Sequence, residues 1–239
     1  MEEYNIQRTL RTYSVTNQFL RQIEEHIMNK MPGLMPTSPG GDPLEGHTTL
    51  LLSGRAGAEH FTPAGNYTQQ GFDNNVEKAA LTFNYWVGQH ADERQAFMAT
   101  IRLSSYSGET DLSITLRAPA AREKVADLER SLLEKMEQNK NSNWIAYPNE
   151  IMPTLVFVLG FLAFIFTFMF ANPILKTICI LLFAGAFYLV THRFMKGYCT
   201  FDSNRQKQLN AIFKLIVIAV SAFIIVSILT PLRKTLWGF

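Results

Sequence analysis

Three apolar stretches after residue 150 are each long enough to cross a lipid bilayer. They run from Ile151 to Phe170, from Ile174 to His192 and from Ala211 to Leu229. A transmembrane helix needs about 20 mostly apolar residues to span a hydrocarbon core about 30 Å thick. None of the three stretches carries a charge in its middle. We therefore expect residues 146–239 to form an all-α membrane domain with three transmembrane helices.

The first part of the chain has a different composition. Charged residues are scattered through residues 1–145, and no apolar run is longer than a few positions. A segment of this length is the size of one ordinary domain and can bury its own core. After residue 150, eight Lys and Arg residues stand against a single acidic residue, Asp202. The sequence thus predicts one water-soluble domain followed by one basic membrane domain.

The positions of the basic residues predict the topology. The link between the first two stretches is short, whereas the link from Arg193 to Asn210 carries four Lys and Arg residues. Basic loops stay in the cytoplasm, so this longer loop and the N-terminal domain should both be cytoplasmic. The acidic N-terminus lacks a signal-peptide pattern. We expect a multi-pass protein of the bacterial inner membrane. A third stretch that re-enters or lies in the interface is the alternative, because Arg233 and Lys234 follow it.

Periodicity in the soluble part predicts an α+β domain. Apolar residues recur at helical spacing after Ser14, which is predicted to cap the first helix, up to about Met31. They recur again after Pro119, where Val125, Leu128, Leu132 and Met136 form one apolar stripe. Between the helices, alternating apolar and polar residues predict four antiparallel strands, which are His47 to Ser53, Val76 to Val87, Ala96 to Ser105, and Leu112 to Arg117. The fold predicted is helix, antiparallel sheet of about four strands, helix, with both helices on one face.

Two segments lack regular periodicity. Residues 32–46 hold four prolines and four glycines, which is typical of a flexible loop. The stretch from Gly54 to Asn75 offers a further irregular hairpin. Asn139 to Asn143 reads as a short polar linker, and Trp144 and Tyr147 as interface anchors ahead of the first span.

No catalytic constellation emerges, so we expect no enzyme, no catalytic residue, no metal and no cofactor. The histidines of the soluble domain match no metal-ligand spacing. An enzymatic site around His47, Glu59 and His60 is the minor alternative. The two cysteines, Cys179 and Cys199, provide no disulfide framework for the soluble domain, which suits a reducing compartment.

Arg102, Arg117 and Trp86 form the candidate ligand site. They fall on the polar faces of predicted strands, where two arginines and an indole could bind an anionic ligand or an oligonucleotide. A solvated sheet face is the plainer interpretation of the same residues. Nothing in the sequence gives direct evidence for nucleic acid.

Aromatic and small residues of the apolar stretches are candidates for helix packing. Phenylalanines recur at i, i+4, i+7 and i+11 along the first stretch, at Phe157, Phe161, Phe164 and Phe168. Small residues let helices approach closely, within one chain or between copies, and those singled out are Gly185, Ala219 and Ser221. We expect self-association, and therefore a homo-oligomer.

The layout resembles small bacterial transmembrane effectors of antiviral defence systems, including those paired with retrons, nucleotide-signal synthases or short Argonautes. The resemblance rests on the order of the parts and on the loop Tyr198-Cys199-Thr200-Phe201-Asp202 beside Ser203-Asn204-Arg205. It covers the whole chain at the level of layout, and it carries over no functional residue.

Two functions follow as hypotheses. In the first, the cytosolic domain binds a partner protein or a small ligand, and the helices then perturb the inner membrane as an abortive-infection effector. In the second, the chain is a non-catalytic anchor or adaptor that localises a cytosolic complex. The partners expected are the lipid bilayer, further copies of the chain, and a cytosolic protein or small ligand.

Overall fold

The computed structural model describes residues 2–35, 45–69, 71–87, 94–141, 143, 152–169, 172–195 and 197–237. The chain divides into two compact units. The N-terminal domain comprises Met1–Ser142 together with Tyr198–Asn204, and the helical unit comprises Asn143–Gly197 and Arg205–Phe239. The first unit ends close to the predicted boundary at residue 145. The return of Tyr198–Asn204 to it was not predicted.

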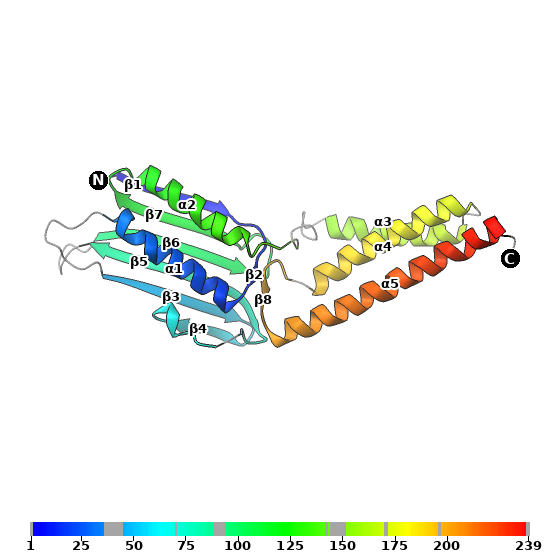
Figure 1. Cartoon of the computed structure of the whole chain (residues 1–239), viewed down its shortest axis with the longest axis horizontal. Coiled ribbons are helices and arrows are strands. Elements are labelled where there is room, and N and C mark those ends of the chain that lie inside the picture. Colours follow the sequence, from blue (N-terminus) through cyan, green and yellow to red (C-terminus); the bar gives the residue numbers. More distant parts are fainter. Residues whose placement is uncertain are drawn as a thin grey trace. The chain divides into compact units, whose positions relative to one another are not determined.

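A six-stranded antiparallel sheet forms the N-terminal domain (Figure 1). In spatial order its strands are β1 (Glu2–Thr9), β7 (Asp111–Ala118), β6 (Arg94–Ser104), β5 (Val76–Val87), β3 (Glu45–Gly54) and β4 (Gly57–Phe61). A one-turn 3₁₀ helix, η1 (Ala64–Asn66), follows β4. A second, two-stranded parallel sheet pairs β2 (Ser14–Val15) with β8 (Thr200–Phe201).

Two helices cover one face of the large sheet (Figure 1). They are α1 (Asn17–Leu34) and α2 (Ala121–Glu137). The N-cap of α1 is Thr16, whose side-chain oxygen accepts from the Phe19 N–H, and not Ser14 as predicted. Pro32 lies inside α1, so the predicted loop begins later than residue 32. The last two residues of that loop, Glu45 and Gly46, belong to β3, and residues 36–44 lie outside the described residues.

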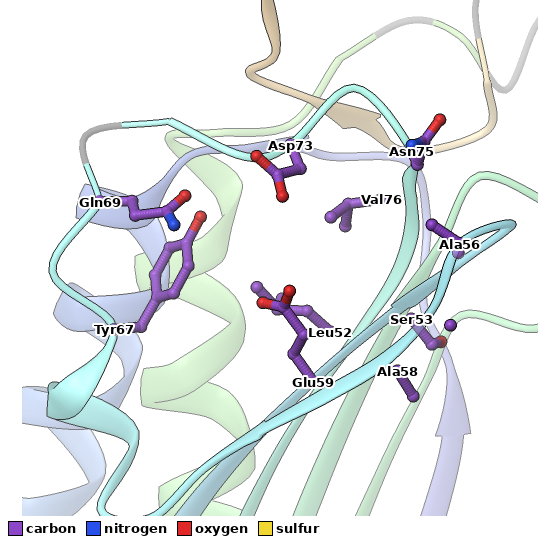
Figure 2. Close-up of a pocket in the computed structure, with 12 residues that line it drawn as sticks. Leu52, Ser53, Ala56, Ala58, Glu59, Tyr67, Gln69, Asp73, Asn75 and Val76 are labelled. Atoms are coloured by element: carbon purple, nitrogen blue, oxygen red, sulfur yellow. The ribbon is translucent and has the colours of Figure 1, made fainter.

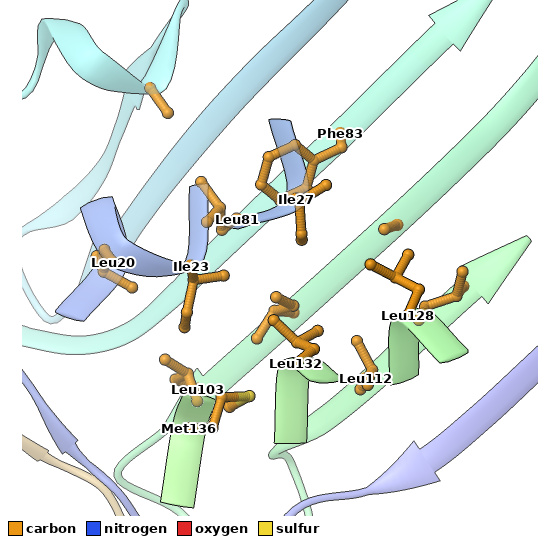
Figure 3. Close-up of a cluster of buried hydrophobic side chains, with 14 of the residues drawn as sticks. Leu20, Ile23, Ile27, Leu81, Phe83, Leu103, Leu112, Leu128, Leu132 and Met136 are labelled. Carbon is orange, nitrogen blue, oxygen red and sulfur yellow. The ribbon is translucent and has the colours of Figure 1, made fainter. Parts of the chain in front are cut away.

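The core lies between these helices and the sheet (Figure 3). Ile23 and Ile27 of α1 and Leu132 of α2 are fully buried against apolar side chains of the middle strands, such as Leu81 and Phe83 of β5. Because successive strand residues point to opposite faces, the alternate residues of each strand line the face that neither helix covers. That open face carries a row of paired small polar residues, which are Thr49, Thr82, Thr100 and Ser113.

The prediction of about four strands was wrong, because the sheet has six. The two edge strands are β1, which was not predicted, and β4, which lies in the stretch where only an irregular hairpin was predicted. In β1 only Tyr4 and Ile6 are half-buried, between exposed polar residues. In β4 four of the five residues are exposed. Edge strands bury little, so their apolar periodicity is weak.

The helical unit contains α3 (Met152–Met169), α4 (Pro173–Met195) and α5 (Asn204–Trp237). Among the described residues, two segments are long and apolar enough to cross a membrane, Ile174–Arg193 and Asn204–Val226. The prediction of three spans was therefore wrong. Within the described part of α3 the apolar run is Leu155–Thr167, which is shorter than the roughly 20 residues that a span needs.

Close packing joins α3 to α4. Ala163 and Ala186 are buried, and a Cβ added at Gly160 would lie 2.3 Å from the Cβ of Ala186. The rings of Phe164 and Phe183 lie 4.8 Å apart between centroids. Gly160 thus allows the two backbones to approach, as small residues do in membrane helix pairs.

Replacing Gly160 with valine should loosen this helix pair, while replacing Gly185 with valine should not. A Cβ at Gly185 would meet no atom within 4 Å. Overpacking a close contact costs about 1–3 kcal/mol. The measurement is the yield of disulfide between cysteines placed at Phe164 and Phe183 in each background. Equal yields in the two valine variants would contradict this account of the α3–α4 contact.

Candidate functional site

The three predicted ligand residues share the open sheet face, with Trp86 and Arg117 toward one end of it and Arg102 toward the other. Trp86 and Ala80 are six residues apart on β5, and Ala80 is the register partner of Arg102. Six residues span about 20 Å of strand, so Trp86 and Arg102 lie near opposite ends of the face. Each arginine also has a carboxylate neighbour: Asp111 lies 3.8 Å from Arg102, and Glu3 lies 3.0 Å from Arg117. The ligand site proposed for these residues stays a prediction.

The segment of residues 198–203, here called the strap, is part of the N-terminal domain although it lies between α4 and α5 in the sequence. Five backbone hydrogen bonds of 2.8–3.0 Å attach it to three other segments. Ser105 and Ser104 accept from the Tyr198 and Cys199 N–H groups, Tyr13 and Val15 accept from Thr200 and Asp202, and the Asp202 carbonyl accepts from the Phe72 N–H. The strap therefore ties together the end of β6, the strand β2 and the segment around Phe72.

Side chains of the strap complete the core. Cys199 is fully buried and Phe201 is 4% exposed. The Cys199 Sγ lies 3.8 Å from the Thr110 Oγ1. Burial raises the pKa of the Cys199 thiol, although the hydrogen bonds around it oppose the shift. A neutral, enclosed thiol is unreactive, so its reactivity reports whether the strap is in place.

Residues 12–15 are held from two directions. On one side they bind the strap through Tyr13 and Val15. On the other they bind the chain that follows α2, where the Asn139 carbonyl accepts from the Ser14 N–H and the Thr12 carbonyl accepts from the Asn141 N–H. Asn139 to Asn141, predicted as a polar linker, is thus attached to the domain. Trp144 and Tyr147, the predicted anchors, lie outside the described residues.

A cavity of about 170 Å³, here called the hairpin cavity, opens beside the β3–β4 hairpin (Figure 2). Its other wall is the segment of residues 67–76, here called the wall loop, of which residue 70 is not described. Glu59 on the hairpin and Asp73 on the wall loop approach the cavity from opposite sides (Figure 2). Leu52, Val76 and the ring of Tyr67 give it an apolar part.

The wall loop connects the hairpin cavity to the strap. Phe61 and Tyr67 meet edge to face at 5.0 Å, Tyr67 stacks on Phe72 at 5.8 Å, and Phe72 meets Phe201 edge to face at 5.4 Å. A Cβ added at Gly71 would lie 3.0 Å from the Asp202 carbonyl oxygen. The contact from the cavity lining to the strap is therefore continuous, and it passes through one aromatic stack.

Tyr67 is the buried polar member of this stack. Its hydroxyl donates to the Gly71 carbonyl at 2.8 Å. Burial, with a contribution from the Asp73 and Glu59 carboxylates, raises the pKa of Tyr67 to about 12. Burial likewise raises the pKa of Tyr13, beside the strap, to about 12.

These two tyrosines predict that the domain loses stability in alkali. In the unfolded chain both phenols ionise near pH 10, whereas in the folded domain they stay neutral until about pH 12. Above pH 10 the unfolded chain binds fewer protons, so stability that is present below pH 10 is lost as the pH rises to about 12. Tyr67→Phe should make this decline shallower, with no change of slope between pH 7 and pH 9. Thermal unfolding at a series of pH values measures it, and a slope unchanged above pH 10 would refute the prediction.

The predicted packing residues of the helical unit have mixed environments. Phe164 contacts Phe183 of α4, while Phe157 and Phe161 are each 53% exposed. The side chain of Phe168 lies outside the described residues. Gly185 and Ala219 are exposed, and Ser221 lines a cleft between α4 and α5. Whether these residues meet lipid or a second copy stays a prediction.

The minor enzymatic alternative is not assembled as a cluster. Glu59 lines the hairpin cavity, whereas His60 pairs with Leu51, and His47 lies four residues before Leu51 on β3 and contacts Trp86 at 5.5 Å. Among the residues that the structure describes, no three His, Cys, Asp or Glu side chains could hold a metal ion.

Sequence reasoning missed both the strap and the hairpin cavity. The strand in the strap is two residues long, too short for a periodic signal. The one usable signal was a Tyr-Cys-Thr-Phe segment, apolar and aromatic, inside an otherwise basic and polar interhelical loop. No family model, curated protein or solved structure matches the chain.

Proposed function

We propose that this chain is a membrane protein in which the state of the N-terminal domain is transmitted to the membrane helices through the strap. One observation carries the proposal, which is that the segment between α4 and α5 is part of the core of the N-terminal domain. Any change that releases or tightens residues 198–203 acts directly on the end of α4 and on the start of α5.

The exposure of the helices supports a membrane location. Only 11% of Ile174–Arg193 and 6% of Asn204–Val226 is buried, so neither segment resembles the core helix of a soluble protein. Such apolar surface needs lipid or other apolar helices around it. Arg193, Arg205 and Lys207 flank the strap in sequence, which favours a cytoplasmic side for the strap. The consecutive helices α3 and α4 pack side by side, so the chain enters and leaves this pair on one side of the bilayer, and the strap stays on the side of residues 1–142.

The strap also favours a signalling role over a simple anchor. An anchor needs one covalent attachment between its soluble part and its helices. Here the domain buries Phe201 and Cys199 from the interhelical segment and forms five backbone hydrogen bonds with it. Domains of this size are stable by about 5–15 kcal/mol, so an interaction of this extent couples the domain's stability to the position of the strap.

The proposed output is a loss of bilayer integrity when the strap is released, under the control of a ligand or protein partner of the N-terminal domain. This is the behaviour of the antiviral effectors that the layout resembles. The alternative is the anchor or adaptor role, in which the helices need only hold the domain at the inner membrane.

The test is ion leakage from liposomes that contain the full chain. A disulfide between Ser14→Cys and Thr200→Cys, in a chain with Cys179→Ser and Cys199→Ala, should lock the strap, because the two residues are register partners whose hydroxyl oxygens lie 3.5 Å apart. Phe201→Ala should release it. A voltage-sensitive dye reports how fast an imposed potassium potential decays.

We expect Phe201→Ala to leak at least threefold faster than the wild type, and adding the oxidised lock to this variant to remove the excess. Reducing the disulfide should restore the leak, which makes each sample its own control. Leak rates that do not differ among the wild-type, released and locked chains would refute the effector proposal and favour the anchor.

A further inference from the structure

We infer that the hairpin cavity is the input site of the N-terminal domain, and that an occupant of the cavity favours the docked strap. The inference deepens the proposed function, on which it rests for its biological meaning, by naming the regulation of the strap. It starts from the position of the cavity, since one wall of the cavity is the segment that the strap holds.

The wall loop has contacts on both of its sides. On the cavity side, Tyr67 and Asp73 line the space opposite Glu59 of the hairpin (Figure 2). On the strap side, the Phe72 N–H donates to the Asp202 carbonyl at 3.0 Å, and the Phe72 ring meets Phe201. Tyr67 and Phe72 stack with an angle of 13° between their rings, so the two sides are in direct contact.

Thermodynamic linkage gives the sign of the coupling. The strap fixes the wall loop in the position that forms the cavity. A molecule that contacts the hairpin and the wall loop together binds only when that wall is in place, and it therefore stabilises the state with the strap docked. By reciprocity, release of the strap should weaken binding in the cavity. Loss of the occupant is then the event that frees the strap.

The side chains that line the hairpin cavity restrict the chemical class of molecule that can bind there. Among the described residues the lining includes two carboxylates, Glu59 and Asp73, with the amides of Gln69 and Asn75, and no Lys, Arg or His side chain. An anion would meet these two carboxylates and no basic side chain of the described lining, which disfavours phosphates and nucleotides. The volume of about 170 Å³ admits a small molecule, with hydrogen-bond donors for the carboxylates and an apolar part for Leu52 and Val76.

The test uses the buried thiol of the strap as reporter. In the full chain with Cys179→Ser, Cys199 is the single cysteine, and a maleimide labels it only when the strap opens. The side chain of Val76 faces the cavity (Figure 2), so Val76→Phe fills the space and stands in for an occupant. Thr100→Phe adds the same ring to the open face of the same sheet, away from the cavity and the strap.

Val76→Phe should slow the labelling of Cys199 at least threefold relative to Thr100→Phe, which should label like the parent chain. Tyr67→Phe, which loses the hydrogen bond to the Gly71 carbonyl, should speed labelling about fivefold, the effect of one hydrogen bond on an opening equilibrium. Protection of the Phe72 amide from hydrogen exchange should follow the same order in all three variants.

Labelling of Val76→Phe that equals or exceeds that of Thr100→Phe would overturn the inference, and so would a Tyr67→Phe chain that labels no faster than the parent. Circular dichroism of each variant shows whether a change reflects global unfolding, and amide protection at Phe72 remains a readout if one variant unfolds. None of these measurements uses leakage. A normal leak response in the lock experiment with no coupling here would refute the cavity as input and leave the proposed function intact.

Discussion

Replacing Phe201 with alanine should lower the free energy of unfolding of the N-terminal domain by about 3–5 kcal/mol, the usual cost of truncating a buried phenylalanine. Phe201 lies between α4 and α5 in the sequence, yet it is 4% exposed and its ring packs against Phe72. Removing the ring leaves a cavity beside the wall loop and loosens the strap. Phe201 lies outside residues 1–142, so a large loss of stability in the N-terminal domain is expected only because the strap is part of the core of that domain.

The measurement is urea-dependent hydrogen exchange of the slowest amides of β6, a middle strand of the sheet, in the detergent-solubilised full chain. Phe157→Ala is the matched control, because it removes the same ring from a helix surface where the residue is 53% exposed. We expect the control to leave β6 protection nearly unchanged. Equal loss of β6 amide protection in the two variants would show that Phe201 does not stabilise the core of the N-terminal domain.

The second large effect concerns a truncated chain. Residues 1–142 alone should not form a stable domain, because they lack the strap and leave Val15 and Phe72 without their contacts to it. Losing Phe201 and the backbone hydrogen bonds together should cost more than the about 3–5 kcal/mol of the point variant. Such a loss is a large share of the about 5–15 kcal/mol of a typical domain.

Adding the strap back in cis should rescue the truncated chain. Asn141 and Thr200 donate to Thr12 and Tyr13, which are neighbours in sequence, so the ends to be joined lie close together. A linker of about eight Gly and Ser residues between Ser142 and Tyr198 is long enough. Thermal unfolding by circular dichroism should show a cooperative transition for residues 1–142 with the grafted strap, and none without it. The same graft with Phe201→Ala is the control, and a cooperative, equally stable fragment without the strap would contradict the role assigned here.

The middle strands of the sheet were predictable because burial of one face gives each strand an alternation of apolar and polar residues. Strand β5 matches its predicted range, and β6 and β7 differ by a residue or two, since one face of each is buried and the other is not. The same holds for α2, whose buried residues Val125, Leu128, Leu132 and Met136 formed the predicted stripe. Both helices lie on one face of the sheet, as predicted (Figure 1).

The candidate site was not predictable from pattern, for physical reasons. The contacts of the strap join residues about 90 to 190 positions apart, and they are single hydrogen bonds and one ring contact, which leave no periodic trace. The alternation on β5, β6 and β7 did predict that Trp86, Arg102 and Arg117 share a face. It could not predict that Arg102 lies at the other end of that face from Trp86 and Arg117, because the register of a strand is set by its partner strands.

The return of the chain to the domain at Tyr198–Asn204 also dictates an order of biogenesis. During synthesis the ribosome releases β1 to α2 first, then the apolar helices α3 and α4, and only afterwards the residues that close the core. The core of the N-terminal domain therefore stays incomplete, with Val15 and Phe72 uncovered, until α4 and the strap have been synthesised. The domain can therefore complete its fold only when the helices are correctly placed. A chain whose helices are misplaced keeps an incompletely folded N-terminal domain and becomes a substrate for proteases.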